Sequence, residues 1–145
     1  MRGISVLAIM VGAAADLILT IVLSGLLEVW VYATTDLIHL PREQAQAALA
    51  AAMQGATAPH IAQLFLGFAC SVLGGVIAAS LARERHLLNS VLAGVLITLF
   101  NLLLFARGVN GGSALELGLI ALTFACYPLG GALRLKLYPP RPQRA

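Results

Sequence analysis

Charge is the property that this sequence has least of. Only 10% of its 145 residues are charged, whereas 60% are hydrophobic. Soluble domains carry about 25% charged residues, because polar side chains must cover the surface that meets water. The composition therefore excludes an ordinary soluble domain, and its excess of apolar residues also excludes a disordered chain. We expect residues 1–145 to form a single membrane domain, with the lipid bilayer as its solvent.

Motifs that mark enzymes and metal sites are also missing. The sequence has no Gly-x-Ser-x-Gly, His-Glu-x-x-His, P-loop or dinucleotide-binding pattern. Its histidines lack the paired spacing of metal ligands. The two cysteines, Cys70 and Cys126, lie inside apolar stretches without a Cys-x-x-Cys pair, so we interpret them as small hydrophobic side chains. We expect no catalytic residue, no cofactor and no metal ion; a lipid-modifying membrane enzyme is the least favoured alternative.

Long apolar stretches are what the sequence does contain. Each has about 20 residues, which is enough for an α-helix to cross a hydrocarbon core of roughly 30 Å. Helices are favoured because backbone polar groups in lipid must be hydrogen-bonded within the segment. The predicted spans are residues 4–27, 61–82, 87–106 and 114–133. The first continues far past Ala15, which favours a span over a cleavable signal peptide. The fold class is therefore an all-α integral membrane protein with four transmembrane helices.

The only long connection between spans, residues 28–60, contains a short helix of its own. Pro41 suits the first turn of a helix, and an alanine-rich run follows as far as Met53. Gly55 is a natural stop. We expect a short helix at about residues 41–54, on the outer surface or in the membrane interface.

Basic residues are distributed unevenly around the spans. Cytoplasmic loops of membrane proteins carry an excess of Lys and Arg. One side would hold Arg2, Arg83, Arg85, Arg134, Lys136, Arg141 and Arg144, and the other Arg42 and Arg107. This asymmetry predicts that both termini lie in the cytoplasm. The compact spans with little charge and few long loops are typical of a multi-pass protein of a bacterial inner (plasma) membrane. The net charge of +3 is then mostly a topology signal, and we expect no nucleic-acid partner.

Two halves of the sequence resemble each other. Residues 68–75 and 124–131 share the pattern Phe-Ala-Cys-x-x-Leu-Gly-Gly, which includes both cysteines. The first and third predicted spans also align, since Ser-Val-Leu-Ala occurs at residues 5–8 and 90–93. We interpret residues 5–83 and 90–139 as parallel two-helix repeats, related by an axis along the membrane normal. The alternative is a chance match within an apolar alphabet.

Asp16 is the one acidic residue near the middle of a predicted span. Ionisable groups at that depth are expensive and mark functional sites by default. Asn101 is its equivalent in the repeat, and Thr123 lies near the same depth on a helix face that it shares with Tyr127. These four residues form a predicted polar or ligand-binding layer. Either a neutral Asp16 bonded to Asn101 is structural, or a titrating Asp16 facing a watery crevice binds a cation or relays a proton.

A second polar group lies toward the predicted outer side. It consists of Glu28, Gln63, Arg107 and Glu116, which are candidates for an outer vestibule. Salt bridges at the rim, such as Arg107 with Glu116, are the simpler explanation and the favoured one. Small residues on the spans, including Ser71 and the Gly-Gly pairs, are more simply explained by close helix packing.

The end of the second span resembles a known pattern. Residues 74–83 read Gly-Gly-x-x-Ala-Ala-x-x-Ala-Arg, which is similar to the inner helix end of small uncharacterised bacterial multi-pass membrane proteins. The resemblance covers these residues alone and implies no activity.

These observations favour a non-enzymatic protein in the bilayer. We expect an accessory or assembly subunit, or a self-associating module, whose partners are lipid and a second copy or another membrane protein. The alternative is a small oligomeric transporter or channel whose pathway runs beside Asp16 and Asn101. A second copy would complete that pathway, because four helices enclose little space.

Overall fold

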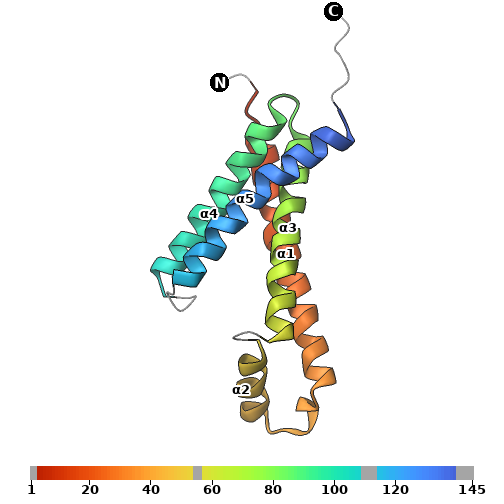
Figure 1. The fold of residues 1–145 in the computed structure, drawn as a ribbon, viewed down its shortest axis with the longest axis vertical. Helices are drawn as coiled ribbons and strands as arrows, with labels where there is room; N and C mark the ends of the chain where they lie inside the picture. The colour runs from red at the N-terminus through yellow and green to blue at the C-terminus, as the bar shows by residue number, and fades with distance from the viewer. Residues whose placement is uncertain (1–2, 54–56, 109–113, 140–145) are drawn as a thin grey trace, which may run out of the picture. The chain divides into compact units, whose positions relative to one another are not determined.

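The computed structural model describes residues 3–53, 57–108 and 114–139, and their regular structure is entirely helical (Figure 1). In chain order the elements are α1 (Val6–Thr34), the short 3₁₀ helix η1 (Leu37–His39), α2 (Arg42–Ala52), α3 (Ala58–Leu81), α4 (His86–Ala106) and α5 (Ala114–Leu137). The predicted all-α class is confirmed.

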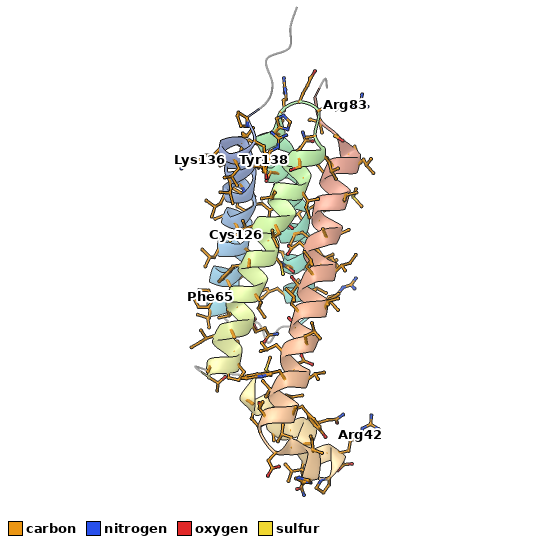
Figure 2. The ribbon with its side chains drawn as sticks, turned by 90° about the vertical axis from the view of Figure 1, so that its right-hand side faces the viewer. Arg42, Phe65, Arg83, Cys126, Lys136 and Tyr138 are labelled. Carbon is orange, nitrogen blue, oxygen red and sulfur yellow. The ribbon has the colours of Figure 1, made fainter. Side chains whose placement is uncertain are left out.

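Four of these helices, α1, α3, α4 and α5, are long and apolar enough to cross a membrane. Their outward side chains are apolar as well. Leu7, Ile21, Phe65 and Leu115 are each between 70% and 72% exposed, and Phe65 is drawn in Figure 2. A soluble protein rarely exposes so many large apolar groups, whereas lipid solvates them. The four predicted spans are thus present as helices suited to a bilayer.

The ends of two helices lie beyond their predicted positions. Hydropathy placed the end of the first span at residue 27, just before a charge, but α1 continues to Thr34 because one glutamate does not interrupt backbone hydrogen bonding. It ends where Asp36 adopts a left-handed conformation, with φ of 58°. Similarly, α5 continues past residue 133 to Leu137, because Arg134 and Lys136 are good helix formers that suit a helix C-terminus.

The chain forms two compact units, and α1 and α3 contribute to both. The first, called the core unit here, comprises Met1–Leu17 and Phe68–Ala145; the second, the loop unit, comprises Ile18–Gly67. The core unit therefore contains the beginning of α1, the end of α3, and all of α4 and α5. The loop unit contains the rest of α1, η1, α2 and the beginning of α3.

In the core unit, small residues let the helices approach closely. The helices α4 and α5 pack side by side (Figure 1). On α1, a Cβ added at Gly12 would lie 2.6 Å from the Ala78 Cβ and 2.7 Å from the Gly74 carbonyl oxygen, both on α3. At Gly130 of α5, an added Cβ would collide with the backbone of Val72. Such contacts replace the hydrophobic driving force that helices lack in lipid.

In the loop unit, the connection between α1 and α3 is held by contacts among its own short helices and by hydrogen bonds at the start of α3. The helix α2 contacts η1, and Leu37 and Ala45 are buried there. The hydroxyl of Thr57 donates a hydrogen bond of 2.6 Å to the carbonyl of Ala52, and the His60 Nδ1 atom lies 3.0 Å from the carbonyl oxygen of Met53. The predicted helix at about 41–54 is thus present as α2, and residues 54–56, including the expected stop at Gly55, lie outside the described residues.

The start of α1 and the turn between α3 and α4 lie at the same end of the core unit. The backbone N–H of Ser5 donates to the Asn89 Oδ1 at 2.8 Å, and the Asn89 Nδ2 lies 3.1 Å from the carbonyl oxygens of Gly3 and Glu84. Figure 2 shows Arg83, Lys136 and Tyr138 toward this end.

Parts of two sequence predictions lie outside the described residues. They are the basic residues Arg2, Arg141 and Arg144, and residues 54–56 and 109–113 of the two proposed repeats. The repeat and the cytoplasmic orientation of the termini stay predictions.

Candidate functional site

A buried polar cluster centred on Asp16 lies inside the core unit. Asp16 is only 4% exposed. The hydroxyl of Tyr127 donates a hydrogen bond of 2.6 Å to its Oδ2 atom. The hydroxyl of Ser71 lies 3.2 Å from Oδ2 and 3.3 Å from Oδ1, and donates to the same carboxylate. The cluster therefore joins α1, α3 and α5 through side chains that are all buried.

Glycines on α1 and α3 bring Asp16 to its partners. Gly12, one turn before Asp16, places α1 directly against Gly74 and Ala78. A Cβ added at Gly74 would lie 3.0 Å from the Asp16 Cβ and 3.3 Å from the Tyr127 hydroxyl oxygen. Any larger residue at position 74 would therefore enter the space in which the carboxylate meets the tyrosine. Because Gly12 and Gly74 have no side chain, α1 and α3 can approach closely enough for Asp16 to reach its partners.

Tyr127 also packs closely against α3 and α4. Its exposed fraction is 0%. A Cβ added at Gly94 would lie 2.8 Å from the Tyr127 Cβ, and one added at Gly75 would collide with the Tyr127 carbonyl oxygen. The hydroxyl of Ser90 donates a hydrogen bond to that same carbonyl. Through Tyr127 the cluster therefore includes α4, so that all four helices of the core unit take part in it.

The cluster satisfies the polar groups that it buries. A buried carboxylate without partners would be very unfavourable, because burial removes its hydration. Here two hydroxyls replace water, and the aromatic ring of Tyr127 fills the surrounding space. Hydrogen bonds between membrane helices contribute about 0.6 kcal/mol on average and up to about 1.7. The stabilisation per bond is modest, and the larger consequence is one defined packing of four helices.

The structure brings together two of the four residues of the predicted layer, Asp16 and Tyr127. Thr123 is half-buried and donates instead to the carbonyl of Leu119 on its own helix, at 2.9 Å. Asn101 is also half-buried and is not a hydrogen-bond partner of Asp16. The part of α4 that faces Tyr127 is at Ser90 and Gly94, about two to three turns before Asn101.

Sequence reasoning assigned Ser71 to helix packing rather than to the site. A signal for it was present, because Ser71 lies on the same face of α3 as Gly67 and Gly75, at a spacing of four residues. A similar signal was present for Ser90, because Gly94 and Thr98 follow it on α4 at a spacing of four residues.

The four vestibule candidates do not form one cluster within either unit. Glu28 and Gln63 belong to the loop unit, where the first is exposed and the second half-buried. Arg107 and Glu116 belong to the core unit. Arg107 is exposed at the C-terminal end of α4, and Glu116 is half-buried in the first turn of α5, where a negative charge suits the helix dipole.

Among the residues that the structure describes, no group of three or more His, Cys, Asp or Glu side chains is placed so that it could hold a metal ion. Cys70 and Cys126 are buried thiols.

No family model matches this sequence, and no curated protein or solved structure matches it either. Function is therefore inferred from the geometry of the core unit.

Proposed function

We propose that this chain is a non-enzymatic protein of the bacterial inner membrane that acts as an accessory or assembly subunit, or associates with itself. The observation that carries this proposal is the enclosure of Asp16, which is 4% exposed and bonded to Tyr127 and Ser71. Asp16 then stabilises the packing of the helices rather than binding a ligand. The proposal includes the orientation that the basic residues favour, with both termini in the cytoplasm.

The enclosure of Asp16 argues against a role in transport. A side chain that binds a moving cation or relays a proton must contact water or substrate at some stage. The carboxylate instead contacts two hydroxyls, and a Cβ added at the neighbouring Gly74 would lie 3.0 Å from the Asp16 Cβ. A fully bonded polar network of this kind favours a unique helix arrangement.

An exposed row of small residues on α5 supports association. Gly118, Ala121 and Ala125 fall on one face of this helix and are all exposed. A Cβ added at Gly118 would have no atom within 4 Å. In membranes such rows let a second helix approach closely, and helix pairs form there. The partner that we favour is a second copy of this chain or another membrane protein.

Native mass spectrometry and crosslinking in mild detergent test the association. We expect wild type to form a homo-oligomer or to retain a membrane partner, and Gly118→Leu to reduce the associated fraction severalfold. Gly25→Leu on α1 is the matched control, because Gly25 also has no atom within 4 Å of an added Cβ. A strictly monomeric wild type without a partner, or equal behaviour of the two variants, would contradict the proposal.

Flux through proteoliposomes tests the transporter alternative. We expect wild type to move no cation or small solute above the rate of empty vesicles. Flux that wild type supports and Asp16→Asn abolishes would overturn the proposal in favour of an oligomeric transporter with a pathway beside Asp16.

A further inference from the structure

An open cleft of about 630 Å³ lies at one end of the core unit, between the start of α1 and the turn that connects α3 to α4. Its lining is amphipathic. The residues concerned are Ile4, Leu7 and Leu81, which are apolar, and Ser5, Arg83 and Glu84, which are polar or charged. A ligand that fills this cleft therefore needs both an apolar part and a charged part.

The walls of the cleft are held in place by Asn89, which is completely buried. Asn89 accepts the Ser5 N–H and contacts the carbonyls of Gly3 and Glu84, so it ties the entry to α1 to the turn after α3. Gly3 has a φ of 97°, and a Cβ added to it would lie 3.1 Å from the Glu84 Oε2 atom. Because these two walls are already joined, a ligand would not have to order them on binding.

Two adjacent opposite charges lie at the mouth of the cleft. Arg83 and Glu84 are both exposed. Neither side chain forms an ion pair with another residue that the structure describes. Leu7 and Leu81 are 72% and 49% exposed beside them. The cleft thus presents a cation, an anion and apolar surface within one small region.

The location of the cleft matches the depth of lipid headgroups. The candidate span α3 ends at Leu81 and the next, α4, begins at His86. The turn between two membrane-crossing helices lies where hydrocarbon gives way to the polar interface. Arginine there binds phosphate through paired hydrogen bonds, and a carboxylate accepts hydrogen bonds from a primary ammonium.

We propose that this cleft binds a glycerophospholipid with an ethanolamine headgroup. Arg83 pairs with the phosphate, Glu84 pairs with the ammonium group, and Leu7 and Leu81 contact the first part of an acyl chain. The two neighbouring charges match a headgroup that itself carries both signs. A choline headgroup cannot donate a hydrogen bond to Glu84, and a glycerol headgroup has no cation to offer. This inference does not depend on the assembly function.

Native mass spectrometry of delipidated protein tests the site. Phosphatidylethanolamine, phosphatidylglycerol and phosphatidylcholine with identical acyl chains are added separately. We expect wild type to retain phosphatidylethanolamine most strongly. Glu84→Gln should weaken that binding by about tenfold, the loss of one charge-assisted hydrogen bond, and remove the preference over phosphatidylglycerol. Arg83→Ala should weaken binding of all three lipids.

Two control variants remove a charge elsewhere. Arg107→Ala lies at the other end of α4, and Glu43→Gln lies on α2; both side chains are exposed. We expect wild-type lipid binding from each. Equal retention of the three lipids by wild type would overturn the proposal, and so would an equal loss in the control variants. Because all four substituted side chains are exposed, loss of folding does not explain a selective effect.

Discussion

The helix α1 carries two carboxylates whose surroundings could hardly differ more. Asp16, in the core unit, is 4% exposed and has two hydroxyl partners, whereas Glu28, in the loop unit, is exposed. Two glycines, one from each unit, differ in the same way. Gly75 of the core unit lies against the backbone of Tyr127, whereas Gly25 of the loop unit has open space around it. Residue type alone therefore does not reveal function in this protein; the neighbours on other helices do.

The glycines give the sharpest test of this comparison. In Gly75→Ala the new methyl group would collide with the Tyr127 carbonyl, which belongs to the backbone and cannot turn aside. We expect a loss of about 3 kcal/mol in the free energy of unfolding, typical of severe overpacking. Gly25→Ala should be neutral or slightly stabilising, because alanine favours a helix more than glycine does. Thermal unfolding in detergent measures both, and equal effects would contradict the assignment of Gly75 to a close contact.

The carboxylates give the next largest difference. Asp16→Ala removes the carboxylate that Tyr127 and Ser71 bond and leaves a cavity, and we expect it to destabilise the protein by about 2 to 3 kcal/mol. Asp16→Asn keeps one acceptor oxygen and should recover part of that loss. Glu28→Ala should change stability by less than about 0.5 kcal/mol, as exposed sites do. The same unfolding assay compares all three, and an Asp16→Ala protein as stable as wild type would show that the cluster contributes nothing.

The two hydroxyls within the cluster provide the finest comparison. Tyr127→Phe removes a hydrogen bond of 2.6 Å and leaves the ring, whereas Ser71→Ala removes longer contacts of 3.2 and 3.3 Å. We expect the free energy of unfolding to fall by about 1 kcal/mol in Tyr127→Phe and by about half of that in Ser71→Ala. Tyr138→Phe is the control, because Tyr138 is 70% exposed. A double-mutant cycle with Asp16→Asn should show coupling for Tyr127 and none for Tyr138.

Two of the four residues predicted for the polar layer, Asp16 and Tyr127, lie together in the structure. Asp16 stands out because a charge inside an apolar stretch is visible without a structure. Tyr127 was found because it lies on a polar face of α5. Asn101 was included as the equivalent of Asp16 in the proposed repeat, and Thr123 by its depth along the span. Neither criterion says which part of α4 or α5 faces α1. Ser90 was missed, although its hydroxyl reaches the Tyr127 backbone.

The sequence by itself determined that this is an all-helical protein with four helices suited to a bilayer. It could do so because lipid requires long apolar segments whose backbone bonds are local, and both properties are written in consecutive residues. Only the tertiary structure decided that Asp16 meets Tyr127 and Ser71, and that Ile4, Leu7 and Arg83 line one cleft. These contacts join residues far apart in the chain, and they depend on how closely glycines let one helix approach another.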